Sequence, residues 1–272
     1  KLNSFFWLFT LDLKSSNKIT QDVIEKWIDD NTNYNIKSWE LDILSKRVIA
    51  WLSNARLTYE NGSEDYKEKF NFLVRKQVNH LINEIYRSKY VDDKLIGCTA
   101  IILCGLCYRD TQFLSYGISL VKKIIEYSLD DLNFPKSRSF RQLIFYLKNF
   151  VLIRELLKDS QSEIPDFINE TIFYLGQSYN FFWQRTKESF LFNGNIEIDN
   201  TEFDKYLSNH GYKFKCQTND MGNYGFINNR KNSLIIDLGN SPDKKFSSNY
   251  QAGALSFEFS HMSEKIVCNA GY

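Results

Sequence analysis

The chain has 272 residues, enough for one large domain or two ordinary ones. Its 34 basic and 33 acidic side chains nearly cancel, which removes the electrostatic argument for nucleic acid as a partner. No apolar run approaches the roughly 18 residues of a membrane span, so no transmembrane segment is expected in this sequence.

The first part of the chain, to about residue 193, has helical periodicity. Apolar residues recur at three- and four-residue steps, as at Phe70, Val74, Val78 and Leu81. Short polar breaks separate the segments, so we expect stacked helical hairpins with antiparallel neighbours. Both an open superhelical scaffold and a closed α/α toroid fit this pattern. The expected helices cover residues 20–30, 39–54, 64–88, 93–108, 111–129, 139–158 and 165–184.

From about residue 195 the pattern changes to strands. Gly, Asn and Ser become frequent, and apolar and polar residues begin to alternate with a period of two. Helices followed by antiparallel strands predict an α+β protein with separate domains, a helical one over residues 1–194 and a strand-rich one over 195–272. The expected strands cover residues 224–227, 233–237, 255–260 and 265–269.

Three of the five cysteines, Cys98, Cys104 and Cys107, lie in one apolar helical segment. The last two have the C-x-x-C spacing of a zinc site, but no second pair follows and no histidine is near in sequence. Free cysteine is among the most often buried residue types. We therefore expect three buried thiols at helix contacts.

The last residues of the chain resemble the signature stretch of the heparinase II/III family of polysaccharide lyases. The segment at 251–258 reads Gln-Ala-Gly-Ala-Leu-Ser-Phe-Glu, and the segment at 267–271 reads Val-Cys-Asn-Ala-Gly. In the family, a loop carrying a histidine precedes such a strand, and the next strand ends near Asn-x-Gly. Weaker resemblance extends over most of the chain, at 39–51, 191–194, 211–212 and 234–239.

The resemblance implies a fold and a setting. The family's fold is an α/α toroid of stacked helical hairpins followed by an antiparallel β-sandwich, so residues 1–194 are expected to belong to the toroid and residues 195–272 to the first sandwich strands. Because the chain starts at Lys1 and stops after a hairpin, we expect a piece of a longer protein with both parts truncated. By resemblance, the expected location is the periplasm or cell envelope.

The family's chemistry implies candidate catalytic residues. Its lyases cleave uronic-acid polysaccharides by β-elimination, which requires a neutralised carboxylate, a base and an acid. The family histidine falls at Gln251, which cannot exchange a proton near neutral pH, whereas the adjacent Tyr250 can if a cation lowers its pKa. Some relatives hold zinc through histidine and aspartate. Here Asn269 stands near one such position and no His-x-His occurs, so no zinc and no other cofactor are expected.

Two further residues are catalytic candidates. Arg138 precedes a helix in a loop that faces the family's cleft, and an arginine is a good bidentate partner for a uronate. A solvated or helix-capping role for Arg138 is an equally good interpretation. Exchanging Arg138 for alanine is expected to lower turnover far more than stability. His210 can act as an acid or base, although a plain loop histidine is the more common case.

The expected substrate-binding residues are Gln251, Asn193, Glu258 and Tyr212. Asn193 alternatively forms a turn, and Glu258 alternatively faces solvent. The expected partner is an acidic polysaccharide. Two other functions remain open: a carbohydrate-binding protein of the same fold that has lost catalysis, and a glycoside hydrolase with two carboxylates. The hydrolase ranks last because the helical part offers no obvious acid pair.

Overall fold

The computed structural model describes residues 2–12, 15–248, 250, 253, 255–262 and 264–269. The chain divides into two compact units. The first comprises Lys1–Ile124 with Glu155–Glu163, and the second comprises Ile125–Arg154 with Ile164–Tyr272. The domain boundary expected at residues 194/195 stays a prediction.

The first unit is built from helices, and α5 lies at its centre. Helix α5 packs against α2 and α4, and its residues from Leu95 to Gly105 are all buried. Serine hydroxyls cap two of the helices: Ser16 accepts from Ile19 N, and Ser63 accepts from Tyr66 N. The elements are η1 (Leu2–Ser4), η2 (Phe6–Thr10), α1 (Asn17–Asn31), α2 (Leu41–Ser53), α3 (Ala55–Thr58), α4 (Glu64–Glu84), η3 (Ile85–Arg87), α5 (Val91–Cys107) and part of α6 (Thr111–Ser128).

Two of the three cysteines in α5 are buried and the third is exposed. Cys98 and Cys104 are buried, and burial raises the pKa of Cys104 to about 12. Cys107 is exposed, which corrects the expectation that all three thiols are buried. It lies in the last turn of α5, beyond the buried stretch. Within the described residues, no group of three or more metal-ligating side chains could hold a metal ion.

The second unit combines helices with a sheet. Helix α8 passes directly into a single π-helical turn, η4, so the segment expected as one helix over residues 165–184 is helical throughout. Helix α9 lies in the part of the chain where only strands and loops were expected. The helices are the remainder of α6 and part of α7 (Phe140–Asp159), α8 (Asp166–Tyr179), η4 (Asn180–Gln184), α9 (Thr201–Asn209) and η5 (Lys244–Phe246).

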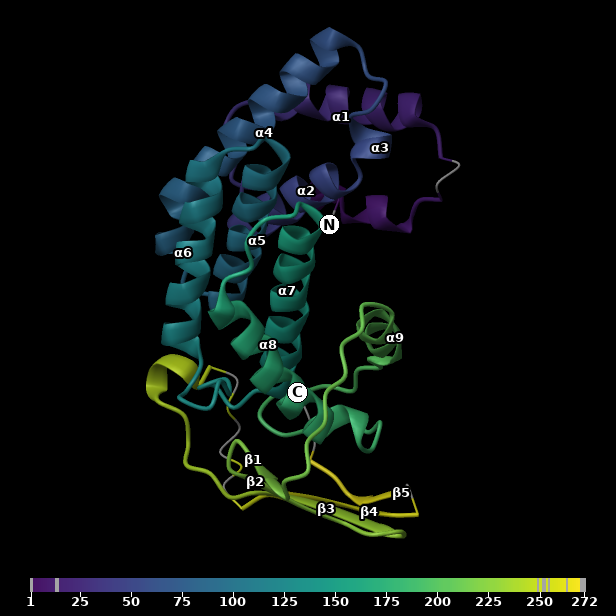
Figure 1. The fold of residues 1–272 in the computed structure, drawn as a ribbon, viewed down its shortest axis with the longest axis vertical. Helices are drawn as coiled ribbons and strands as arrows, with labels where there is room; N and C mark the ends of the chain where they lie inside the picture. The colour runs from purple at the N-terminus through teal and green to yellow at the C-terminus, as the bar shows by residue number, and fades with distance from the viewer. Residues whose placement is uncertain are drawn as a thin grey trace. The chain divides into compact units, whose positions relative to one another are not determined.

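Within the described residues, five antiparallel strands form one sheet in the order β1-β2-β3-β4-β5 (Figure 1). Each strand pairs with the next along the chain; short turns make three of the connections, and a longer segment joins β3 to β4. The register places Tyr224 opposite Asp237 and Ile235 opposite Glu258. All four expected strands are confirmed to within three residues. The strands are β1 (Asp220–Met221), β2 (Tyr224–Asn228), β3 (Asn232–Asp237), β4 (Phe257–His261) and β5 (Glu264–Val267).

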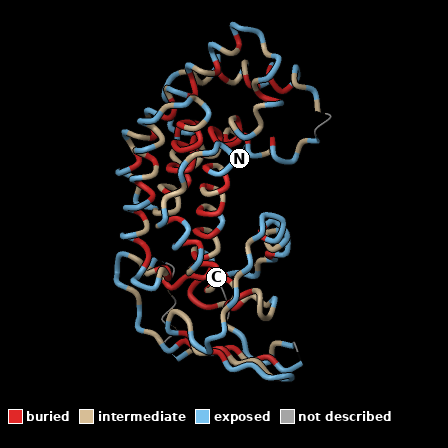
Figure 2. The backbone as a smooth tube through the Cα atoms, viewed as in Figure 1, coloured by how far each residue is buried: buried red, intermediate tan, exposed pale blue. Residues whose placement is uncertain are grey.

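One face of the sheet, the inner face, is covered by aromatic side chains from the helices and loops of this unit. The rings of Phe140, Phe182 and Phe192 contact Tyr224, with centroids 4.9 to 5.5 Å apart. The strands alternate between buried and more exposed residues (Figure 2). The buried residues of the inner face are Tyr224, Phe226, Ile235, Asp237, Glu258 and Ser260.

The alternation expected in β4 is confirmed, but the polar set is the buried one. Glu258 and Ser260 lie on the inner face, whereas Phe257 is 44% exposed. Alternation alone gives two faces and does not say which one the helices cover. No helix in the described residues is both long and apolar enough to span a bilayer.

Candidate functional site

An extended segment, Ser189 to Asn193, crosses the inner face of the sheet and is called the strap here. At one end, Lys265 Nζ of β5 donates to the backbone oxygen of Ser189 at 2.5 Å. In the middle, Leu191 N donates to Glu258 Oε1 of β4 at 2.7 Å. The strap therefore links the edge strand β5 to the centre of the sheet.

The far end of the strap meets Tyr224 of β2. The Asn193 side-chain amide donates to the Tyr224 hydroxyl and also to the backbone oxygen of Arg138, the latter at 3.3 Å. The Tyr224 hydroxyl in turn donates to that same oxygen at 3.3 Å. Asn193 is buried, and its φ of 51° is a left-handed conformation that asparagine tolerates well. Both the turn role and a place beside Arg138 thus hold for Asn193.

Arg138 forms a buried ion pair with Asp237 of β3. Nη2 of Arg138 lies 2.7 Å from Oδ1 of Asp237, and the side chains are 8% and 0% exposed. Nη1 donates to the backbone oxygen of Asn240 at 3.1 Å. The guanidinium also lies over the Tyr224 ring, 4.6 Å from its centroid. Neither a solvated nor a capping role describes this side chain, because its charge is neutralised inside the fold.

Gly239 makes room for the Arg138 guanidinium. A Cβ atom at position 239 would lie 2.4 Å from Cζ of Arg138, closer than real Cβ atoms approach other heavy atoms. The backbone N–H of Gly239 also donates to Asp237 Oδ1 at 3.0 Å. The Asp-Leu-Gly sequence that begins at the last residue of β3 therefore supplies both the counter-ion and the space.

Tyr224 contacts both Asn193 and Arg138, and Arg138 pairs with Asp237. We call these four residues the Tyr224 cluster. Burial raises the pKa of Tyr224 far above its ordinary value, even though the positive charge of Arg138 acts in the opposite direction. The hydroxyl thus stays protonated at neutral pH and serves as a donor. A hollow of about 310 Å³ borders the cluster, and its lining includes Arg138, Asn223 and Lys136.

Tyr250 lies close enough to Tyr224 for the two hydroxyls to interact electrostatically. Its hydroxyl is buried and makes no hydrogen bond with any described residue. The neighbouring Gln251, expected to bind substrate, lies outside the described residues. Arg138, Asn193 and Tyr250, three of the candidates expected from sequence, thus gather around one residue.

Glu258 of β4 is a buried acceptor on the same inner face of the sheet as Tyr224. Besides Leu191 N, its carboxylate accepts from the backbone and side-chain nitrogens of Asn269 at 3.3 and 3.2 Å, and it pairs with Lys265 Nζ at 3.3 Å. The alternative that Glu258 faces solvent is wrong, because the side chain is buried on the inner face. These contacts make Glu258 the anchor that holds the strap to β4 and β5.

His210 and Tyr212 are placed by contacts with helices. His210 follows α9 and is exposed, with its ring 4.3 Å from that of Tyr206. The Tyr212 hydroxyl accepts from Arg154 Nη1 at 3.2 Å. Both residues therefore belong to the surroundings of α7 and α9, whereas Arg138, Asn193 and Glu258 lie against the sheet.

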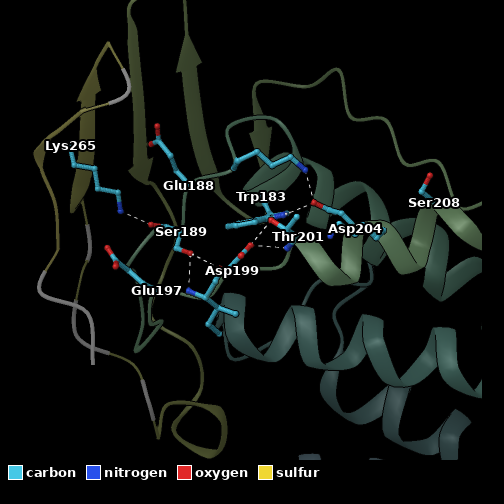
Figure 3. Close-up of a pocket in the computed structure, with 12 residues that line it drawn as sticks. Trp183, Glu188, Ser189, Glu197, Asp199, Thr201, Asp204, Ser208 and Lys265 are labelled. Carbon is cyan, nitrogen blue, oxygen red and sulfur yellow. Dashed lines mark hydrogen bonds and ion pairs between the residues drawn. The ribbon is translucent and has the colours of Figure 1, made fainter. Parts of the chain in front are cut away.

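A larger hollow of about 800 Å³ lies beside α9, and Asp204 is its most connected residue (Figure 3). The Asp204 carboxylate accepts four hydrogen bonds, from Tyr179 (3.0 Å), Gln184 (2.8 Å), Trp183 (2.9 Å) and Lys187 (2.5 Å). Partial burial opposes ionisation, but these four bonds prevail and hold the pKa of Asp204 below its ordinary value.

Most of the side chains that line this Asp204 hollow carry a polar group. Asp199, just before α9, accepts from the N–H and hydroxyl of Thr201 at 2.8 and 2.5 Å, which forms an Asx turn at the start of that helix. Figure 3 shows Lys265 directed toward Ser189 at one end and Asp204 near Trp183 at the other. The hollow offers carboxylates, ammonium groups and hydroxyls, the groups that hydrogen-bond sugar hydroxyls.

Sequence reasoning missed Tyr224, Asp237 and Asp204. The first two share the phase of Phe226 and Ile235 along their strands, so their burial follows from the sheet alternation. A buried carboxylate requires a cationic or hydrogen-bonding partner, which was a usable signal that Arg138 pairs with an aspartate. No comparable signal exists for Asp204, because its donors come from the end of α8, from η4 and from the turn after it.

Comparison with known proteins gives a family match for the C-terminal residues and a fold for the chain. Residues 217–272 match the family model described as heparinase II/III-like, C-terminal. No curated protein matches the chain. Among solved structures, the chain is similar to heparinase III, with 15% identity, 92% of this chain and 46% of that chain covered, and a TM-score of 0.73.

Two further solved structures are similar at 13% identity and a TM-score of 0.69. One is the heparan sulfate lyase HepC from Pedobacter heparinus, with 99% of this chain and 47% of that chain covered. The other is heparinase III, the BT4657 gene product, with 97% and 46% covered. The chain thus spans less than half the length of these structures, and at this identity they establish the fold, a helical toroid followed by a sheet. The heparinase II/III-like match therefore holds for residues 217–272, and the chain as a whole shares the fold of these lyase structures.

Proposed function

We propose that this protein is a polysaccharide lyase that cleaves uronic-acid-containing glycans by β-elimination. The observation that carries the proposal is that residues 217–272, which match the heparinase II/III-like family, contribute Tyr224, Asp237 and Tyr250 to the same cluster as Arg138. The solved structures of similar fold support it, since their titles name heparinase III and a heparan sulfate lyase.

The reaction needs three groups. A base removes the proton on the carbon next to the uronate carboxylate, the electron pair forms a carbon–carbon double bond, and the glycosidic oxygen leaves with a proton from an acid. Neutralising the carboxylate stabilises the charge that develops during proton removal. We assign the base to Tyr250, because its hydroxyl is buried without a hydrogen-bond partner among the described residues.

Arg138 and Asn193 are the proposed partners of the substrate carboxylate. Arg138 borders the 310 Å³ hollow, and its charge is already near the expected position of the substrate. A uronate would have to share the guanidinium with Asp237, which counts against a large contribution from Arg138. The Asn193 amide is bonded to Tyr224 and to Arg138 O, so it acts only if one of these bonds is exchanged.

The other candidate residues are proposed to bind the substrate or to support the site. The Asp204 hollow, at about 800 Å³, has the size of a site for sugar residues. His210 and Tyr212 stay proposed as acid or base and as substrate contact, with their places near α7 and α9 as described. Glu258 is proposed to support the site by fixing the strap, and Gln251 stays a proposed contact.

The second candidate function is glycan binding without cleavage. The occupied guanidinium of Arg138 favours it, because a residue neutralised by Asp237 contributes less to stabilising a developing negative charge. Both functions predict that the protein binds the glycan, and only the lyase predicts that the glycan is cleaved.

Incubation of the purified protein with heparan sulfate and with an unsulfated uronate polymer separates them. The lyase proposal expects growth of the ultraviolet absorbance of an unsaturated uronate, which requires the new double bond. Tyr250→Phe is expected to lower this rate at least about a hundredfold. Its folding stability should be almost unchanged, because the hydroxyl leaves no described partner behind.

The control is Tyr127→Phe, which removes a hydroxyl from an exposed ring of the same unit. Binding without any absorbance change in the unsubstituted protein supports the second candidate and refutes the first. A Tyr250→Phe variant with full turnover refutes the assignment of the base while leaving the lyase activity intact.

A further inference from the structure

The loop joining β2 to β3 has a fixed backbone. Asn229 N donates to Asn232 O at 2.9 Å, and Asn229 Oδ1 accepts from the N–H groups of Lys231 and Asn232 at 3.0 and 2.8 Å. Met262 N, at the end of β4, donates to Lys231 O at 2.6 Å. Arg230 and Lys231 have exposed side chains. Because the backbone that carries them is fixed, little backbone entropy is lost when they bind a ligand.

Arg230 and Lys231 line a hollow of about 180 Å³ together with Arg185, and we call it the hairpin hollow. Arg185 is itself held in place. Its Nη1 donates to the backbone oxygen of Thr218 at 3.0 Å, and its guanidinium lies 5.0 Å from the centroid of the Phe226 ring. Three cationic side chains from two different parts of the chain therefore converge on one small space.

The hairpin hollow carries a net positive charge. Glu188 is the one carboxylate among the described lining residues, and its Oε2 accepts from the Ser260 hydroxyl at 3.1 Å. Asparagine and serine side chains complete the lining with neutral donors. Three cations against one carboxylate favour an anion, and the planar guanidinium fork suits the paired oxygens of sulfate or carboxylate.

The size of the hollow limits what enters it. A water molecule accounts for about 30 Å³ of liquid, so 180 Å³ corresponds to about six waters. A single sulfate or carboxylate group fits within this volume. We propose that the hairpin hollow binds one anionic group of an acidic glycan, at a position separate from the Tyr224 cluster. The class of ligand rests on the proposed function, whereas the anion site rests on the geometry.

The test is the affinity of the full chain for heparan sulfate and for hyaluronan, an unsulfated uronate polymer, measured by calorimetry at two salt concentrations. The variant is Arg230→Gln with Lys231→Gln. The matched control is Lys122→Gln with Lys123→Gln, which removes two exposed charges from α6. We expect the hairpin variant to bind about tenfold more weakly, with a smaller salt dependence, and the control to bind as before.

Each outcome decides the proposal. Weaker binding to heparan sulfate alone identifies sulfate as the group, and weaker binding to both polymers identifies the carboxylate. Equal affinities of the hairpin variant and the control would overturn the proposal, as would no binding of either polymer. Turnover measured on the same samples is independent: hairpin-dependent binding without cleavage refutes the lyase and keeps the anion site. Circular dichroism of both variants confirms that the sheet is intact.

Discussion

Arg138 and Asp237 lie 99 residues apart in the sequence and form an ion pair of 2.7 Å inside the fold. The pair connects the loop before α7 to the end of β3. Burying two charges is costly, and the attraction between them offsets the cost only when both are present. The pair thus fixes where this loop meets the sheet, and the loss of either partner leaves an uncompensated buried charge.

Asp237→Asn is expected to lower the free energy of unfolding by about 3–5 kcal/mol, because the Arg138 guanidinium loses its counter-ion. Denaturant unfolding followed by near-ultraviolet circular dichroism measures it. The control is Glu202→Gln, which breaks the exposed pair between Lys205 and Glu202 and should leave the midpoint unchanged. An Asp237→Asn protein as stable as the control would show that Arg138 is free to bind elsewhere.

Glu258→Gln is expected to destabilise the protein by about 1–3 kcal/mol, because Lys265 loses its charge partner and the strap loses a charged acceptor. Native-state hydrogen exchange at Leu191 should speed up in parallel, since its N–H donates to this carboxylate. Glu264→Gln in the exposed start of β5 is the comparison. Unchanged exchange at Leu191 would contradict the anchoring role of Glu258.

Asp204→Asn tests the hollow beside α9 through its acid response. The pKa of Asp204 is held below its ordinary value of about 3.9, so its ionised form stabilises the fold above that pH. This contribution is lost as pH falls below about 4. The variant should be less stable than the wild type at pH 7, and the difference should shrink between pH 4 and pH 2. A difference independent of pH would exclude the ionised carboxylate as its cause.

Asp93→Asn is the corresponding test in the first unit, where the pKa of the carboxyl is raised and the expected change in stability is opposite in sign. Burial first, and then the charges of Asp42, Asp92 and Glu40, raise the pKa of Asp93 to about 6. A raised carboxyl pKa means that the folded protein holds a proton more tightly than the unfolded chain, so stability falls as pH rises from about 4 to 6.

The Asp93→Asn variant should therefore gain stability at pH 7, on the order of 1 kcal/mol, because solvent screens a half-exposed carboxyl. Asp65→Asn in the first turn of α4 is the control, and there the loss of a favourable helix-dipole charge should destabilise slightly. Thermal unfolding at pH 5 and pH 8 distinguishes the two variants. An Asp93→Asn protein less stable than wild type at pH 8 would contradict the prediction.

The sequence pattern predicted the helices and strands well, because both depend on local periodicity. The apolar stripe from Phe70 to Leu81 became α4, and the alternation around Phe257 became β4. Helix α9 was missed because it is short and strongly polar, with Leu207 as its one buried residue. Its start was nevertheless readable from the Asp199-Asn200-Thr201 run of turn- and cap-forming residues, in which Asp199 accepts from Thr201 N.

The site was only partly predictable, because its pairs join distant parts of the chain. Sequence reasoning selected Arg138 as a free cation, but the structure gives it Asp237 as a partner. The exchange of Arg138 for alanine is accordingly expected to destabilise the fold strongly as well as to lower turnover. This revises the expectation from the sequence that turnover alone would fall strongly. Which residues of two strands become neighbours depends on the register between the strands. The period-two pattern of one strand does not predict its register with the next.

The strap has a consequence for the order of events during synthesis. The residues that hold Ser189 and Leu191 come 76 and 67 positions later in the chain. A ribosome adding about 5–20 residues per second needs several seconds to deliver them. During that interval α8 can be complete while the aromatic side chains behind the strap still lack the strands that cover them, so a nascent chain passes through a stage with exposed apolar surface that a chaperone can recognise.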